Sequence, residues 1–190
     1  MTAMPAAQTM TAQEYLELPE AQHSRPWNLV EGELVMTEAG LVHQRAANEL
    51  LFTLTSWIRA QPGRGEATLP IDVLIDDRNV YAPDVLWYAE EHVPDRPDVR
   101  PYAVPDLAIE VRSPSTWRYD IGAKKSGYER EGLPELWLVD TAASEVLVFR
   151  RSSPSATTFD VSLQLGTDDV LESPLLPGFA LPVDRVFGCD

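Results

Sequence analysis

Two acidic residues stand inside otherwise apolar segments and are the clearest candidates for chemistry. Glu110 interrupts the run LAIEV (107–111), and Asp84 follows a proline within YAPDVL (81–86). Burying an unpaired carboxylate is costly, so an acid in a buried strand needs a partner. Two such acids on neighbouring strands would repel each other and tend to share a proton or hold a cation. Oxygen ligands without cysteine or histidine suit Mg²⁺ or Mn²⁺.

Each acid also has a plain structural interpretation. Glu110 could face solvent on an edge strand, although a strand that precedes a crossover helix is usually central. Asp84 could be a solvent-facing acid beside a bulge that Pro83 introduces. We favour burial for Glu110, and the sequence leaves Asp84 open when it is considered alone.

The only two lysines of the chain, Lys124 and Lys125, are neighbours, whereas the other thirteen basic residues are arginines. Lys124 follows Asp120 by four residues, one turn into a helix expected over 120–130. Its ammonium could reach the strand ends where the carboxylates lie, orient a nucleophile there and neutralise charge in the transition state. The alternative is that both lysines only keep the surface soluble, which is their usual role.

A sheet and flanking helices are needed to bring these residues together. Apolar runs at 107–111 and 136–139 flank the expected helix, which Gly132 and Pro134 end. A buried strand, a helix and a second buried strand form a βαβ crossover, normally with parallel strands. The sequence therefore predicts an α/β fold with a mixed β-sheet flanked by helices and one βαβ crossover.

Local patterns predict the remaining elements. A capping box at TAQE (11–14) opens a short helix through about residue 18, and an apolar stripe at helical steps predicts a helix up to Arg59. The expected strands lie at 27–37 (two strands around a Glu31-Gly32 turn), 67–75, 80–88, 145–150 and 158–165. We expect one domain over 1–190, with a core at 11–150 and C-terminal strands and loops at 151–190.

Several of these stretches resemble a known family. Pro83-Asp84 followed by EVR (110–112) resembles the PD-(D/E)xK nuclease signature. More narrowly, the chain resembles the bacterial restriction-endonuclease-like family (Uma-type) of that superfamily over residues 11–150. The stretches that carry this resemblance are NLVEGELV (28–35), EVRSPST (110–116), DIGAK (120–124) followed by Tyr128, and GLPELWLVD (132–140). His43 corresponds to a histidine that is common in the family.

The resemblance implies a restriction-endonuclease-like core, a divalent metal (Mg²⁺ or Mn²⁺) held by Asp84 and Glu110, and hydrolysis of phosphodiester bonds. It also implies that Lys124 replaces the lysine that other nucleases carry two residues after the glutamate, where this chain has Arg112. Arginine does not deprotonate in proteins and cannot act as a base, but it can clamp a phosphate. Lys124 is therefore favoured as the catalytic cation, and Arg112 is an accessory candidate.

Glu33 and His43 are further accessory candidates, as extra metal ligands or as groups that position water. A single histidine without ligand spacing is weak support for a metal site, so His43 is more readily interpreted as a structural residue at a helix start.

Composition limits the functions that the chain can have. It has 190 residues, is 44% hydrophobic and carries a net charge of −15, which argues against a generic nucleic-acid binder and against a peripheral protein on an anionic membrane. No apolar run approaches the ~20 residues that span a bilayer. Residues 1–10 lack the pattern of a secretory signal, and the single cysteine, Cys189, excludes an intrachain disulfide. We expect a cytoplasmic protein, and a homodimer is compatible with the sequence.

The sequence thus predicts a metal-dependent endonuclease, with DNA as the favoured substrate. One alternative is a nuclease-fold binding or assembly protein without significant catalytic activity, because the net charge opposes binding of duplex phosphates. The segment 110–135, with five basic and five acidic residues, is locally neutral and weakens that objection. A remoter alternative is a sugar or nucleotide hydrolase that uses Asp84 and Glu110 as an acid/base pair.

Overall fold

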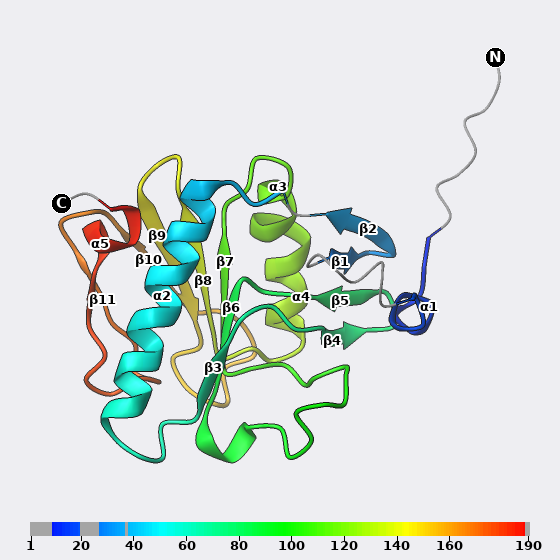
Figure 1. The fold of residues 1–190 in the computed structure, drawn as a ribbon, viewed down its shortest axis with the longest axis horizontal. Helices are drawn as coiled ribbons and strands as arrows, with labels where there is room; N and C mark the ends of the chain where they lie inside the picture. The colour runs from blue at the N-terminus through cyan, green and yellow to red at the C-terminus, as the bar shows by residue number, and fades with distance from the viewer. Residues whose placement is uncertain (1–8, 20–26, 37, 189–190) are drawn as a thin grey trace.

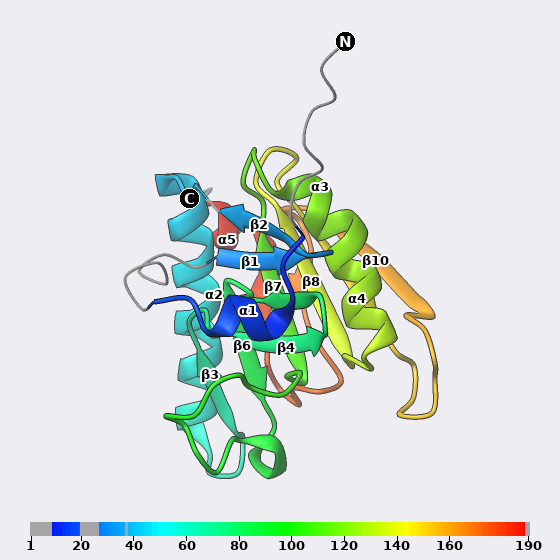
Figure 2. The same cartoon turned by 90° about the vertical axis from the view of Figure 1, so that its right-hand side faces the viewer.

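A six-stranded mixed sheet lies between two layers of helices (Figure 1). The computed structural model describes residues 9–19, 27–36 and 38–188, so the predictions for Cys189 and for residues 1–8 lie outside the described residues. Helix α2 covers one face of the sheet and helices α3 and α4 cover the other, as the view turned by 90° also shows (Figure 2). A four-stranded sheet of order β2-β1-β5-β4 lies to one side of the six-stranded sheet, which has the order β10-β9-β8-β7-β6-β3.

The bounds of the elements are as follows. The helices are α1 (Ala12–Leu16), α2 (Leu41–Ala60), the 3₁₀ turn η2 (Glu90–His92), α3 (Trp117–Tyr119), the π-helix η3 (Asp120–Lys124), α4 (Lys125–Arg130) and α5 (Val183–Phe187). The strands are β1 (Trp27–Val30), β2 (Glu33–Met36), β3 (Glu66–Thr68), β4 (Val73–Asp76), β5 (Asn79–Tyr81), β6 (Val85–Tyr88), β7 (Leu107–Val111), β8 (Glu135–Asp140), β9 (Glu145–Arg150), β10 (Val161–Leu165), β11 (Val170–Leu171) and β12 (Leu181–Pro182).

The predicted βαβ crossover is confirmed. Strands β7 and β8 pair in parallel, with Glu110 opposite Leu138, and the chain between them forms α3, η3 and α4. Strand β7 is central, because β6 pairs with its other edge in antiparallel fashion. Its residues alternate between the two faces: Ile109 belongs to the core under α2, and Ala108 to the core under α4. Glu110 is only 3% exposed, so the edge-strand interpretation does not hold.

The β1–β2 hairpin is also confirmed. Its two turn residues, Glu31 and Gly32, have φ angles of 53° and 84°. Two positive φ values in a two-residue loop are those of a type I′ turn, whose twist matches that of the flanking strands. The capping box of α1 is present as well, with reciprocal bonds between Thr11 and Glu14.

Two strand predictions are wrong in a way that matters for Asp84. The segment 80–88 is predicted as one strand that Pro83 interrupts, but β5 belongs to the four-stranded sheet and β6 to the six-stranded sheet. The segment 67–75 is likewise divided between β3 and β4. Each break contains a proline, Pro83 or Pro70, which cannot donate a ladder hydrogen bond. The chain therefore crosses between sheets at residues 82–84 and delivers Asp84 immediately before β6.

The C-terminal segment is more ordered than the sequence patterns indicate. It contains the β11–β12 pair and helix α5, which contacts α2. Leu171, Phe179 and Val186 from this segment are buried in the core that lies under α2. In the described part of the chain, no helix is long and apolar enough to cross a bilayer.

Candidate active site

Asp84 and Glu110 meet at the carboxyl end of β7. Antiparallel pairing sets Val85 opposite Ile109, and the same register continued by one residue sets Asp84 opposite Glu110. The backbone N–H of Val111 donates to Oδ2 of Asp84 at 2.7 Å, which fixes this carboxylate at the strand end. The structure thus brings together the two acids that the sequence singles out.

Lys124 joins these acids from the crossover helix. Its Nζ lies 2.6 Å from Oε2 of Glu110 and 3.1 Å from Oδ1 of Asp120. Lys124 is 3% exposed, so its ammonium is not a surface solubilising group. The ammonium also lies 5.7 Å from the ring centroid of Tyr81, which adds a cation–π contact.

Further buried polar groups hold this cluster in place. The hydroxyl of Tyr128 donates to Oε1 of Glu110 at 2.8 Å, and the hydroxyl of Thr116 donates to Oδ2 of Asp120 at 3.3 Å. Asp120 and Tyr128 lie within the motifs that carry the family resemblance, but their sequence context alone predicts no role for either. A signal was present, because Thr116, Asp120, Lys124 and Tyr128 recur at every fourth residue, a spacing that sets each side chain next to the following one on a helix.

His43 approaches the acids from the first turns of α2, on the other side of the sheet. Its Nε2 is 3.2 Å from Oδ2 of Asp84. This is an ion-pair distance, although neither ring nitrogen has a well-directed hydrogen bond with the described residues, and the side chain is only 5% exposed. Buried ring nitrogens that lack a hydrogen bond are costly, so this position suits a histidine that binds an external group.

The charges of the cluster do not balance. Burial raises the pKa of Glu110 to about 8; the ammonium of Lys124 opposes this shift, and Asp120 and Asp84 add to it. Burial also raises the pKa of Asp120. Desolvation would lower the pKa of Lys124, but Glu110 and Asp120 outweigh it and hold this pKa above its usual value. Several carboxyl groups therefore compete for one ammonium, so the surplus acid either keeps a proton or takes another cation.

The other two accessory candidates lie apart from this cluster. Arg112 donates from Nη1 to both carboxylate oxygens of Asp140, at 2.8 and 2.9 Å, and its guanidinium lies 5.5 Å from the ring centroid of Trp117. Glu33 is exposed on β2 and has no hydrogen bond or ion pair with the described residues of the cluster. Lys124, and not Arg112, is therefore the cation in contact with Glu110.

The donor set fits a hydrated hard cation. No three His, Cys, Asp or Glu side chains among the described residues are close enough together to enclose a metal ion. Mg²⁺ does not require such a cage, because it usually keeps several waters and binds through one or two carboxylates. Asp84 and Glu110 supply two carboxylates, and the unbonded ring nitrogens of His43 lie beside Asp84.

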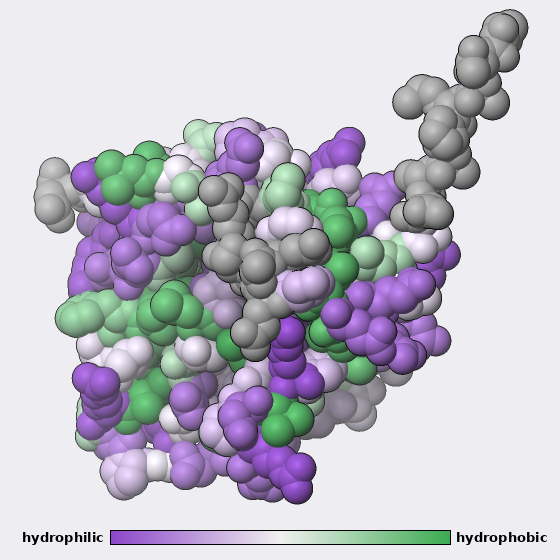
Figure 3. Space-filling model, turned by 45° about the vertical axis from the view of Figure 1, so that its right-hand side comes forward, coloured by the Kyte–Doolittle hydropathy of each residue, from purple (hydrophilic) through white to green (hydrophobic). Residues whose placement is uncertain are grey.

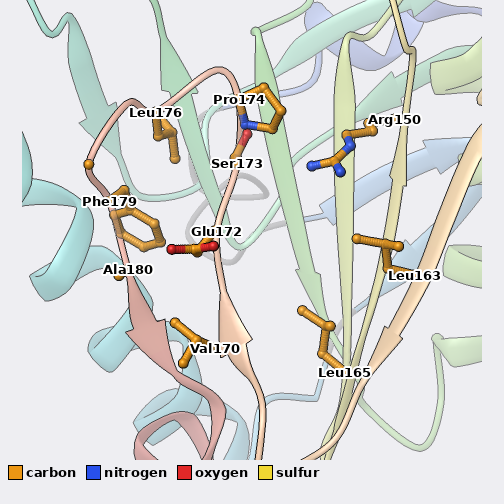
Figure 4. A pocket seen from close by; sticks show the side chains of 11 residues that line it. Arg150, Leu163, Leu165, Val170, Glu172, Ser173, Pro174, Leu176, Phe179 and Ala180 are labelled. Carbon is orange, nitrogen blue, oxygen red and sulfur yellow. The ribbon is translucent and has the colours of Figure 1, made fainter.

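A surface groove lies elsewhere on the molecule. It has a volume of about 460 Å³ and runs between β10 and the C-terminal segment, with Arg150, Leu163 and Phe179 among its lining residues (Figure 4). Neither Asp84, Glu110 nor Lys124 lines it. The buried charges, and not this groove, mark the candidate site, because perturbed pKa values that arise from desolvation and specific charge partners are typical of functional positions.

Comparisons with known proteins agree with this fold. A crystal structure described as "a putative nuclease belonging to DUF820" from Anabaena variabilis superposes with a TM-score of 0.77, covering 95% of this chain and 98% of that chain at 19% sequence identity. No curated protein matches the sequence. The family model described as "Uma2: Putative restriction endonuclease" matches residues 12–184, which extends beyond the stretch 11–150 that carries the resemblance in the sequence. The chain therefore belongs to the Uma2 family, and the resemblance to restriction-endonuclease-like proteins is confirmed.

Proposed function

We propose that the protein is a metal-dependent endonuclease that hydrolyses phosphodiester bonds in DNA. The observation that carries this proposal is the buried cluster of Glu110, Lys124 and Asp120, with Asp84 and the unbonded His43 beside it. Such a cluster contains more carboxylate groups than its one ammonium can compensate, and this excess favours binding of a divalent cation. Membership of the Uma2 family supports a nuclease, and we extend it to metal dependence and to DNA.

Each side chain has a role that follows from its position. Asp84 and Glu110 would hold Mg²⁺ or Mn²⁺, which supplies charge neutralisation at the phosphate and polarises a water molecule. Lys124 stabilises the negative charge that develops on the phosphoryl oxygens. Tyr128 fixes Glu110 by its hydrogen bond, and His43, beside Asp84, would position the attacking water.

Binding of DNA must overcome the acidity of the chain. Hydrophilic residues cover much of the face drawn in Figure 3, interrupted by hydrophobic groups, and the whole chain carries a charge of −15. Affinity for nucleic acid rests largely on the neutralisation of phosphates, so this chain should bind DNA weakly and with a requirement for divalent cations. A bound cation offsets locally the charge of the acids that hold it.

A cleavage assay tests the proposal. Supercoiled, linear and single-stranded DNA are incubated with Mg²⁺, Mn²⁺ or EDTA and with wild-type, Glu110→Gln, Asp84→Asn or Lys124→Met protein. We expect cleavage by the wild type with a divalent cation, none in EDTA, and none by the three variants. A sugar or nucleotide hydrolase that uses the two acids as an acid/base pair would instead keep its activity in EDTA.

Glu135→Gln is the matched control for Glu110→Gln. Glu135 is also a fully buried strand glutamate, on the neighbouring strand β8, but it accepts hydrogen bonds from Trp137 and Ser173 and pairs with Leu107, at the other end of β7 from Glu110. A folded Glu135→Gln protein should therefore cleave DNA like the wild type. Wild-type cleavage by Asp84→Asn would contradict the assigned site.

One observation favours a second function, a nuclease-fold binding or assembly protein without significant activity. Glu110 and Lys124 are each 3% exposed and are paired with each other, so the cluster is closed to solvent. Calorimetry with Mn²⁺ separates the two functions, because the absence of binding at millimolar concentration would favour the binding protein. Light scattering of the purified protein would test whether it forms the homodimer with which the sequence is compatible.

A further inference from the structure

Lys124 contacts one oxygen of Glu110, which is one of the two proposed metal ligands. Its ammonium lies 2.6 Å from Oε2 of Glu110, and Tyr128 donates to Oε1 at 2.8 Å. Both oxygens of Glu110 are therefore already engaged by protein groups. A divalent cation bound to Glu110 would share this carboxylate with an adjacent ammonium, and two positive charges at one buried carboxylate repel each other.

Asp120 gives the ammonium a second counter-ion. Its Oδ1 is 3.1 Å from Nζ of Lys124, and its other oxygen accepts the hydrogen bond from Thr116. Asp120 is 2% exposed, so it is as deeply buried as the lysine. A buried ammonium that lost its only partner would be strongly destabilised, but Lys124 can leave Glu110 and keep its charge compensated.

On the basis of the proposed metal-dependent function, we propose that Lys124 closes the metal site by forming an ion pair with Glu110. Binding of a cation then moves the ammonium of Lys124 from Glu110 to Asp120. Asp120 is then a positioning residue, because it acts on the site only through Lys124. An ammonium has three donors, so the one released from Glu110 becomes available to a phosphate oxygen. The exchange makes the catalytic lysine available only when the cation is present.

Calorimetric titration with MnCl₂ tests this exchange on four proteins: the wild type, Asp120→Asn, the double variant Lys124→Met/Asp120→Asn, and the control Arg185→Met/Glu49→Gln. The Lys124 double variant removes one positive and one negative charge and leaves Glu110 free of the ammonium. The control removes the same two charges from the ion pair between α2 and α5, where Arg185 and Glu49 are 2.6 Å apart. A thermal melt of each protein verifies folding, and Lys124→Gln/Asp120→Asn is the second charge-free pair if the methionine variant does not fold.

We expect opposite effects from the two cluster variants. Asp120→Asn should bind Mn²⁺ about tenfold more weakly, because Lys124 then has only Glu110 as its ionised partner. The double variant should bind about tenfold more tightly than the wild type, since a site that is open in about one molecule in ten binds about ten times more weakly than an open one. The control should keep the wild-type affinity. A purely structural role of Asp120 would weaken binding in both cluster variants.

The outcomes separate the exchange from the proposed function. Wild-type affinity in both cluster variants, or weaker binding in both, would overturn the exchange and leave the metal site standing. If the wild type and every variant fail to bind Mn²⁺, the metal site itself is wrong, and the exchange falls with it. Tighter Mn²⁺ binding by the double variant, together with weaker Mn²⁺ binding by Asp120→Asn, supports both the exchange and the metal site.

Discussion

Removing the ammonium of Lys124 should destabilise the protein more than removing any surface charge. In Lys124→Met, a side chain of similar length replaces one that is 3% exposed and lies 2.6 Å from Glu110 and 3.1 Å from Asp120. Breaking a buried ion pair by removing one partner costs about 3–5 kcal/mol, because the remaining charge is buried without compensation. For a chain of this length, that corresponds to a fall in Tm of about 6–20 °C.

The loss of folding stability in Lys124→Met should depend on pH in a defined direction. The folded-state pKa of Glu110, raised to about 8 by burial, lies above its ordinary value of 4.5. Such an acid contributes stability that is fully present below the unfolded-state value and is lost as the pH rises through the folded-state value. Without Lys124, the pKa of Glu110 rises further. The difference in stability between Lys124→Met and the wild type should therefore be smaller at pH 6, where Glu110 is protonated in both proteins, and should grow as the pH rises above 8, where the wild type ionises Glu110 beside an ammonium and the variant does not.

Urea denaturation of both proteins at pH 6 and pH 9 measures this difference. Arg185→Met is the control, because its ion pair with Glu49 is half exposed and should be worth less than about 1 kcal/mol at either pH. A loss below about 1 kcal/mol for Lys124→Met at pH 9, or an equal loss at both pH values, would refute the view that this lysine compensates buried acids.

Three further changes test other contacts. Tyr128→Phe leaves the buried Oε1 of Glu110 without its 2.8 Å hydrogen bond and should cost about 1–3 kcal/mol, measured by urea denaturation. Gly65→Ala should cost more than about 2 kcal/mol by the same measurement, because Gly65 has a φ of 71° and the new Cβ would lie 1.9 Å from a backbone carbonyl oxygen of β6. The hydrogen bond with Asp106 raises the pKa of His92, so an NMR titration should find it above 6.5 in the wild type and closer to 6.5 in Asp106→Asn.

The central elements of the fold can be predicted because their patterns are local. The run LAIEV and the run LWLV at 136–139 are strands buried on both faces, and the helix between them forces a parallel crossover. The two-sheet arrangement cannot be predicted in this way. Both 67–75 and 80–88 have strand composition throughout, and a proline marks only where a ladder bond is missing, not that the chain leaves one sheet for another.

The acids of the site can be predicted for the same reason, since a carboxylate in an apolar run is conspicuous. The groups that surround these acids cannot be predicted from such a local pattern. Val111 stabilises Asp84 through its backbone N–H, which no side-chain pattern encodes. The placement of Arg112 depends on Asp140, which is 28 residues away and is brought close only by the pairing of β7 with β8.

The inward orientation of Lys124 depends on a feature that sequence periodicity does not contain. In an α-helix with 3.6 residues per turn, each step of four residues drifts by about 40°, so three steps would carry Tyr128 far from the line of Thr116. The π-helix η3 spans the middle step, from Asp120 to Lys124. Its wider turn makes a step of four residues fall short of a full turn and reverses the drift. Thr116, Asp120, Lys124 and Tyr128 can therefore all face the strand that carries Glu110, and one local departure from α-helical geometry aligns the whole polar row with the acid.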